Sequence, residues 1–490
     1  MVFRSLRGQG QCASQRALAS GGKLKKLIKI KYLSSFFVLC VGLISDLTMA
    51  QVEAGTAPKV AQAADAAKPA SSRDALFGLD TSATETATPT PSSSAWRGYL
   101  QAEAARAYRD PEHWSKARLR LDLNRQGQFG DNVKWKIGGR VDYDAAYDRS
   151  NFYPAPVRND QRYGFALREN YLDIGAGDWD FQLGRQHIIW GEMVGLFFAD
   201  VVSAKDTREF LLPEFDQLRT PQWAGLASYS KNNSHLDLVW IPVPTVDNIG
   251  KPGADFYPYP LPVQANYLGE QKPASQLKNS NYGLRLSHLK NGWDVSGFYY
   301  HSIDAAPTFY RVSAPLAPTV FQARHDKINQ FGGTVSKDLG SMVFKGELVY
   351  TEGRKYNVQT RVAQPDGLVK QNTLDYAMGL DFTLGADTRL NLQAFQRVFF
   401  AHDADIIPAK HESGASIFVN SKLGHNLEAQ TLLVHSLNRR DWMLRPRVIW
   451  GFEKNWRLAV GADIFSGRQT GFFGRYDNND RVYTEVRYSF

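Results

Sequence analysis

Between residue 95 and residue 490, short stretches of the chain alternate apolar and polar side chains with a period of two. Each stretch has about the ten residues that a tilted strand needs to cross a lipid bilayer. No sustained helical period competes with this pattern, except over 190–220. We therefore expect an all-β fold, a transmembrane antiparallel up-and-down β-barrel of about 18 strands. The eighteen stretches are 95–106, 115–125, 132–144, 161–174, 178–189, 222–231, 234–242, 279–289, 292–302, 328–337, 341–351, 373–384, 387–399, 414–423, 426–437, 441–450, 454–465 and 480–490.

The connections between these stretches alternate in length. Short connections are 175–178, 231–234, 290–292, 385–388, 423–426 and 453–455, and the long ones between them include 190–221, 243–278, 303–327, 352–372, 400–413 and 466–479. Outer-membrane barrels have short periplasmic turns and long extracellular loops. An even number of strands would return the chain to the periplasmic side, so the pattern is consistent with a barrel that closes on its first strand.

Several stretches have one face that is apolar throughout. In 373–384 this face comprises Leu374, Tyr376, Met378, Leu380, Phe382 and Leu384. The opposite faces carry charges, so we assign the apolar faces to lipid, with Trp and Tyr at the membrane interfaces.

The charged faces are then expected to line the lumen, where bases outnumber acids by fourteen to nine. Basic rings on a pore wall favour anions. An alternative is that most of these charges pair across strands and stiffen the wall. The bases are Arg118, Arg120, Lys134, Lys136, Arg140, Arg285, Lys345, Arg389, Arg397, Arg445, Arg447, Arg457, Arg481 and Arg487, and the acids are Asp122, Asp142, Asp144, Glu347, Asp375, Asp381, Glu428, Asp463 and Glu485.

Two segments break the alternation. The parity slips near Glu169, which indicates a β-bulge within 161–174. The connection 190–221 carries many large apolar residues, so it is not expected to lie in open solvent. It could fold into the lumen as a constriction with Arg185, His187 and Glu192 nearby, or it could pack over the mouth as a lid.

The last stretch places Val482, Thr484, Val486, Tyr488 and Phe490 on one face. A bulky aromatic residue at the end of a half-buried strand resembles the terminal signature that the barrel-insertion machinery of Gram-negative bacteria reads. Phe490 is therefore a candidate assembly signal and a residue of the closing strand.

Residues 1–50 have the order of a secretory signal peptide, with a basic run at 23–31, a short apolar run and small residues at Thr48 and Ala50. Both cysteines lie in this leader, so neither a disulfide nor a zinc–thiolate site is expected after cleavage near Ala50. Without the leader, 50 basic and 48 acidic residues remain, a net charge of +2. This balance gives no reason to expect nucleic acid as a partner.

Residues 51–94 are rich in Ala, Pro, Ser and Thr and are expected to be a disordered periplasmic segment ahead of a barrel over 95–490.

The motifs Gly184-Arg185-Gln186 and Trp190-Gly191-Glu192, with the segments 200–206 and 212–223, resemble a family of Gram-negative outer-membrane β-barrels of unknown function. That family is related to alginate-export-like porins, and the likeness covers roughly 95–490. Its members are often encoded beside exporters of the resistance-nodulation-division (RND) type. The resemblance implies a barrel, and it suggests traffic of lipids, steroids or aromatic compounds without fixing a substrate.

These observations lead us to expect a porin-like outer-membrane channel for a small or polymeric solute, with an anion-biased lumen and no cofactor or metal. One alternative is an outer-membrane component that moves hydrophobic compounds together with an RND-type exporter in the inner membrane. An outer-membrane enzyme is a further alternative. The sequence lacks a Gly-x-Ser-x-Gly segment after the leader, and its nearest acid–histidine cluster is His402, Asp403 and Asp405. The expected partners are outer-membrane lipids, the insertion machinery and the solute.

Overall fold

The computed structural model describes residues 95–490 except 194, 196–197, 259–264, 314–318 and 362–363. The signal peptide predicted over 1–50 and the disordered segment predicted over 51–94 lie outside the described residues. Among the described residues, no helix is long and apolar enough to cross a membrane.

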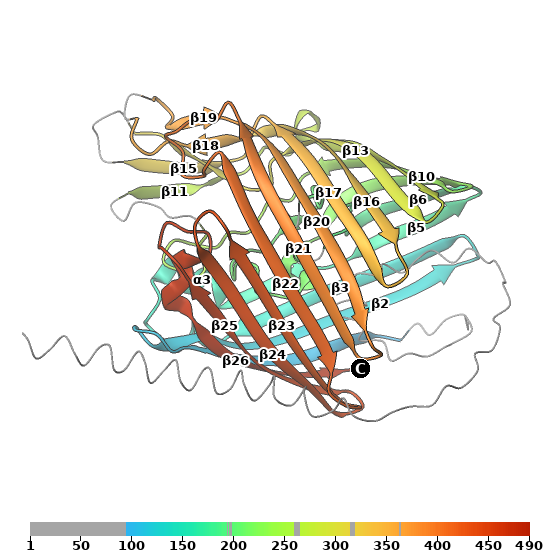
Figure 1. The fold of residues 1–490 in the computed structure, drawn as a ribbon, viewed down its shortest axis with the longest axis horizontal. Helices are drawn as coiled ribbons and strands as arrows, with labels where there is room; N and C mark the ends of the chain where they lie inside the picture. The colour runs from blue at the N-terminus through green and yellow to red at the C-terminus, as the bar shows by residue number, and fades with distance from the viewer. Residues whose placement is uncertain (1–94, 194, 196–197, 259–264, 314–318, 362–363) are drawn as a thin grey trace, which may run out of the picture. The chain divides into compact units, whose positions relative to one another are not determined.

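Eighteen antiparallel strand positions form one closed barrel (Figure 1). Each strand position pairs with the next along the chain, and β26 pairs with β1, so the sheet closes into a ring. Among the described residues, β4 pairs with β3 and with no second strand. All eighteen sequence stretches become strands, which confirms the predicted fold class. The strands are β1 Arg97–Ala107, β2 His113–Phe129, β3 Val133–Asp144, β4 Tyr163–Leu167 with β5 Asn170–Ala176, β6 Trp179–Gln186, β9 Gln222–Lys231, β10 Ser234–Val243, β12 Asn281–Lys290, β13 Trp293–Ile303, β16 Lys327–Asp338, β17 Met342–Glu352, β20 Asn372–Leu384, β21 Thr388–Phe400, β22 His411–Lys422, β23 Leu427–Ser436, β24 Asp441–Glu453, β25 Trp456–Ser466 and β26 Arg481–Ser489.

The fourth strand position is interrupted where the sequence pattern slips. β4 pairs with one half of β3 and β5 with the other half, and the break falls at residues 168–169. The Asn170 side chain spans the break, because its Nδ2 donates to the Gly138 carbonyl at 2.9 Å and its Oδ1 accepts from the Gly138 amide at 3.3 Å. The irregularity predicted near Glu169 is therefore present as a break between two short strands.

The long loops all lie at one end of the barrel, which we call the loop end, and the opposite end, which we call the turn end, has short turns only (Figure 1). The loop end also carries two short connections, 108–112 and 437–440. The turn between β12 and β13 shows the local reason for a short connection. Asn291 and Gly292 both have positive φ, 51° and 74°, as the tightest hairpin turns require. The long connections carry further elements: α3 Ala155–Gln161, β7 Ala204–Lys205, α4 Phe215–Leu218, β8 Arg219–Thr220, β11 Asn266–Gln271, η1 Leu277–Asn279, β14 Thr308–Arg311, β15 Val320–Arg324, β18 Lys355–Asn357, β19 Leu368–Lys370 and η2 Gly474–Asn479.

Strand β20 shows how the two faces of the wall differ. Asp375 and Asp381 are buried on the inner face, whereas Met378 on the outer face is 59% exposed. Leu119, Leu183, Phe331 and other large apolar side chains are exposed on the outside of other strands. A solvent-facing surface of this kind would be costly, and a lipid-facing one is stabilising.

The barrel closes through Phe490, whose amide donates to the Gly98 carbonyl at 3.0 Å and whose carbonyl accepts from the Gly98 amide at 2.9 Å.

Deleting Phe490 is expected to lower the yield of folded barrel, because it removes these two seam bonds, each worth about 1 kcal/mol, together with the candidate assembly signal. The measurement is the heat-modifiable fraction of the protein in outer-membrane preparations. Phe490→Leu keeps both backbone bonds. A yield equal to wild type for the deletion would contradict both roles. A loss in the leucine variant as large as that in the deletion would assign the effect to the ring.

Candidate functional site

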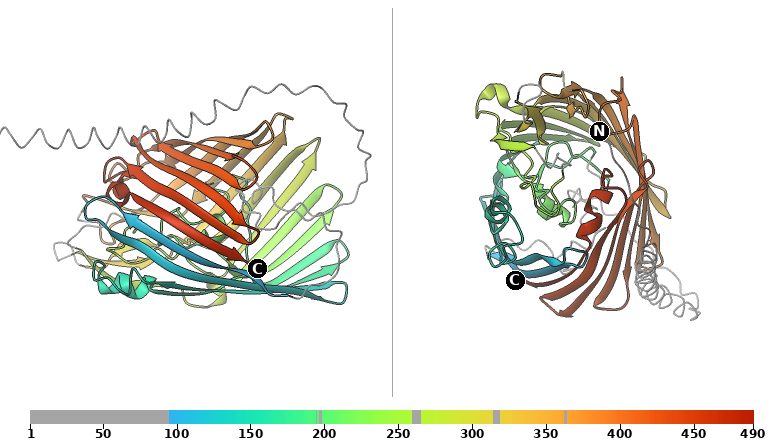
Figure 2. Two further views of the ribbon diagram at one scale, coloured as in Figure 1. Left: turned by 90° about the horizontal axis from the view of Figure 1, so that it is seen from below. Right: turned by 90° about the vertical axis from the view of Figure 1, so that its left-hand side faces the viewer.

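The described residues of the connection between β6 and β9, 187–221, lie inside the ring of strands, as the view into the barrel shows (Figure 2, right, green). Its backbone reaches β17, because Glu347 on the inner face of that strand accepts hydrogen bonds from three loop amides. Those amides belong to Glu192, to Met193 at 2.5 Å and to Ala199 at 3.0 Å. Of the two placements that the sequence left open, the structure therefore shows the lumenal one.

The first half of the loop packs on one side of the wall through apolar contacts. Trp190 is fully buried, with its ring 5.3 Å from Phe298 and 5.8 Å from Tyr300 on β13. Ile188 and Val202 are buried in the same cluster. This packing explains why a connection so rich in apolar residues can lie inside a barrel whose wall is mostly polar.

The second half of the loop crosses to the opposite side and meets a basic wall. Glu209 forms ion pairs with Lys116 and Arg118 of β2 and with Arg481 of β26. The Lys116 Nζ lies 2.5 Å and the Arg481 Nη2 3.3 Å from the same carboxylate oxygen. Arg120 of β2 also donates to the Gln217 side chain.

Glu214 lies within reach of three guanidinium groups. Arg447 of β24 and Arg457 of β25 are each 3.3 Å from one of its carboxylate oxygens, and Arg487 of β26 is 3.2 Å from the other. Burial by itself raises the pKa of Glu214, but the three cations outweigh that effect and hold the pKa well below the usual range of a glutamate. The carboxylate is therefore ionised at neutral pH and links the loop to three neighbouring strands.

Most of the charged residues predicted to line the lumen form ion pairs. Lys134 and Arg389 are exposed near the turn end. The pore-lining role of the whole set stays a prediction. The pairs along the wall and with other loop residues are Arg118 with Asp144, Arg120 and Arg140 with Asp142, Lys136 with Glu169, Arg168 with Asp122, Arg285 with Glu192, Lys345 with Asp381, Arg397 with Asp375, Arg445 and Arg481 with Asp463, and Arg457 and Arg487 with Glu485.

The structure does not bring the three constriction candidates together. Glu192 lies inside, 3.7 Å from Arg285 of β12, and burial lowers the pKa of His187 to about 4. Arg185 is different, because it pairs in register with the outward-facing Trp223 and its Nε donates to the Leu167 carbonyl at 2.8 Å. Strand alternation thus places Arg185 on the outer face, away from the loop.

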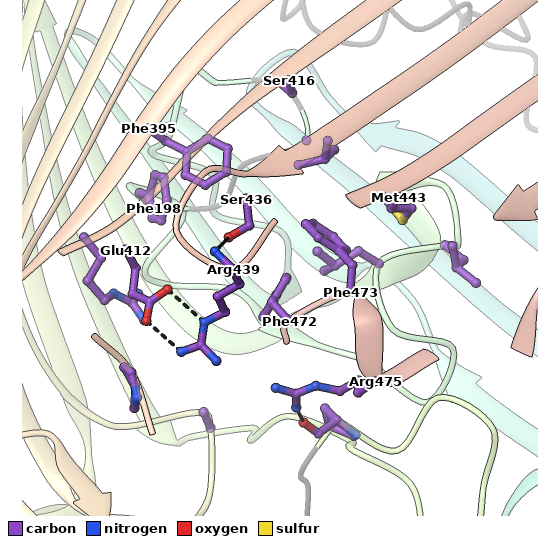
Figure 3. Close-up of a pocket in the computed structure, with 18 of the residues that line it drawn as sticks. Phe198, Phe395, Glu412, Ser416, Ser436, Arg439, Met443, Phe472, Phe473 and Arg475 are labelled. Atoms are coloured by element: carbon purple, nitrogen blue, oxygen red, sulfur yellow. Dashed lines mark hydrogen bonds and ion pairs between the residues drawn. The ribbon is translucent and has the colours of Figure 1, made fainter. Parts of the chain in front are cut away.

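A cavity of about 710 Å³ lies between the inserted loop and the inner face of β21–β24. In the close-up of Figure 3, the rings of Phe198 and Phe395 lie on one side and those of Phe472 and Phe473 on the other. Its basic side chains outnumber its acidic ones: Arg354, Lys355, Arg397, Arg439, Arg445, Arg447 and Arg475 against Glu214, Asp304 and Glu412.

The apolar part of this cavity was missed by the sequence reasoning. Phe395, Leu432, Val434 and Met443 occupy inner-face positions of their strands, where the alternation predicts polar residues. Apolar residues at strand positions where the alternation predicts polar ones are the sequence signal from which this part of the cavity could have been predicted. The ring of Phe395 covers Gly414 of β22, since a Cβ there would lie 2.3 Å from the ring.

The acid–histidine cluster of the sequence does not form a nucleophile–base arrangement. Asp403 and Asp405 bind Arg361, and the His402 Nε2 lies 2.9 Å from the Pro408 carbonyl oxygen. No group of three or more His, Cys, Asp and Glu side chains within the described part of the chain could hold a metal ion.

Comparisons with known proteins agree with this architecture. Residues 113–407 match the family described as "Protein of unknown function (DUF1302)". No curated protein matches the chain significantly. Among solved structures, Acinetobacter baumannii OccAB1 is 9% identical with a TM-score of 0.51, over 81% of this chain and 95% of that one. OccAB3 of the same organism is 9% identical with a TM-score of 0.48, over 81% and 98%. At this identity the likeness to OccAB1 shows the fold alone, that of an outer-membrane, porin-like β-barrel.

Proposed function

We propose that this chain, which belongs to the DUF1302 family of proteins of unknown function, is a channel that passes a small or polymeric solute across the outer membrane and prefers anions. The observation that supports the proposal is the meeting of the inserted loop with the basic wall. A closed barrel offers the path, and the loop narrows it beside a cluster of guanidinium groups.

The charges at this narrowing do not cancel, which is the ground for the anion preference. In the two connected ion-pair networks that contain Glu209 and Glu214, nine basic side chains meet seven carboxylates. A fixed surplus in a narrow, low-dielectric passage raises the local concentration of the opposite ion. The bases are Lys116, Arg118, Arg120, Arg140, Arg445, Arg447, Arg457, Arg481 and Arg487, and the acids are Glu103, Asp142, Asp144, Glu209, Glu214, Asp463 and Glu485.

The test is the reversal potential of single channels in planar bilayers under a KCl gradient. Wild type is expected to prefer chloride. The double variant Arg447→Glu, Arg457→Glu should shift the preference toward potassium, because the two substitutions together lower the net charge at the narrowing by four units.

The matched control is Lys290→Glu with Lys454→Glu, which changes the charge equally at exposed positions of the turn end. Charges more than about 10 Å from the ion path are screened at 0.1 M salt, so this control should leave the reversal potential nearly unchanged. A wild-type channel without ion preference would refute the anion bias, and a protein that never conducts would refute the channel.

A second candidate function, movement of hydrophobic compounds together with an RND-type exporter, is favoured by the phenylalanines of the lumenal cavity. The exporter itself rests on the family resemblance, and crosslinking in intact cells would test it. An enzymatic role finds no support in the geometry around His402. Placement in the outer membrane after cleavage near Ala50, insertion by the barrel machinery and contact with outer-membrane lipids complete the proposal.

A further inference from the structure

The inner wall at β21–β24 is organised in rows that change character with depth. Near the loop end, Arg397 of β21 lies beside Glu412 of β22 in the strand register. The middle rows place Phe418 beside Leu432, and Val434 beside Met443. The deeper rows place Arg445 beside Leu432 and Arg447 beside Gln430. Along one line, the wall therefore changes from a row of opposite charges to apolar rows and then to rows that carry arginines.

The loop and a neighbouring connection complete the apolar middle of the cavity from the other side. Phe198, Leu211 and Leu212 of the loop line it, as does Phe473 from the connection between β25 and β26. Such a belt is unfavourable in a pore that only water and inorganic ions fill, because it leaves apolar surface facing water. Concave apolar surface with a few placed polar groups is the usual form of a ligand site.

Charged donors bound the belt at both ends. At the outer end, Arg439 is held by Glu412 at 2.7 Å (Figure 3). At the deep end, both contacts of Arg447 with Glu214 are 3.3 Å long, and its buried Nε has no hydrogen-bond partner among the described residues. Buried donors are normally paired, so this guanidinium is suited to donate hydrogen bonds to an oxyanion.

We propose that this cavity binds an amphiphilic anion, with a rigid aromatic or polycyclic body in the apolar belt and one carboxylate or sulfonate beside Arg447. The inference deepens the proposed function and rests on it, since the ligand would be the solute that the channel selects. The volume of about 710 Å³ suits a ligand of this class, because small-molecule sites span roughly 300–1,000 Å³. Aromatic walls favour flat rings, which pack against them by edge and face.

The experiment is isothermal titration calorimetry on the full chain purified in a non-ionic detergent, with naphthalene-2-sulfonate as the probe. Naphthalene-2-methanol lacks the charge, and inorganic sulfate lacks the body. Each is expected to bind at least about tenfold more weakly than the probe. Naphthalene-2-methanol loses the charge-assisted hydrogen bonds, and sulfate loses the apolar contacts. Equal affinity for either comparison compound would overturn the inference.

Leu432→Trp fills the belt from the wall and should weaken probe binding by at least about tenfold, a change of 1.4 kcal/mol. Leu433→Trp, one residue on and facing the outside, is the matched control and should bind as wild type does. Unchanged binding by Leu432→Trp would place the probe elsewhere and overturn the site. Conductance of the same preparations is read separately: a conducting protein that does not bind the probe refutes only the site, whereas binding without conductance refutes only the channel.

Discussion

Replacing Glu214 by Lys is expected to raise the single-channel conductance several-fold, because it should release the second half of the inserted loop from the wall. Three guanidinium groups lie 3.2–3.3 Å from this carboxylate. A pair of unit charges about 4 Å apart interacts by about 4 kcal/mol at an effective dielectric constant of about 20, and the substitution turns three attractions into repulsions. Burial of Phe210 and Leu212 in the neighbouring apolar cluster opposes release by only about 1.5–3 kcal/mol for each side chain.

The control for this prediction is Asp216→Lys, which makes the same charge change two residues away. Asp216 is exposed on α4. This variant is therefore expected to alter ion preference while the conductance stays near that of wild type. If correctly folded Glu214→Lys channels conduct as wild type does, the loop is held by its apolar contacts alone, and the electrostatic account of the narrowing is wrong.

The strands of this fold could be predicted because lipid imposes a strict rule on each of them. β9 begins and ends where the alternation does, at Gln222 and Lys231. In β20 the same rule separates the buried Asp375 and Asp381 from the exposed Met378. Every residue of such a strand faces either lipid or the interior, so local sequence is enough to assign it.

The position of the inserted loop could not be predicted in the same way. Its apolar residues excluded open solvent, but both a lid and a constriction would bury them. The deciding contacts join Glu214 to Arg447 and Arg487, more than two hundred residues away. Such pairs leave no periodic mark in the sequence. The short pairings inside the loops, such as β18 with β19, were missed because strands of three residues are too brief to show an alternation.

The charged wall also makes a prediction about stability, which depends on Asp463 at the centre of the basic surplus. This carboxylate is fully buried and accepts from Arg445 and Arg481 at 2.8 Å each. Asp463→Asn should destabilise the barrel by about 3–5 kcal/mol, because removing one partner leaves uncompensated buried charge. The measurement is the urea dependence of folding into lipid vesicles, followed by heat-modifiable migration on gels.

Asp477→Asn is the matched control for Asp463→Asn, since it removes the same carboxylate from a partly exposed pair with Arg109 at 3.5 Å. An exposed pair contributes about 1 kcal/mol or less, so this control should unfold close to wild type. Equal costs for the two substitutions would contradict the burial of the wall charges, because water reaching Arg445 and Arg481 would screen the loss. A large difference would instead show that the interior is dry enough for a basic surplus to act on a passing anion. The stability of the wall and the selectivity proposed for the pore thus depend on the same shielding from water.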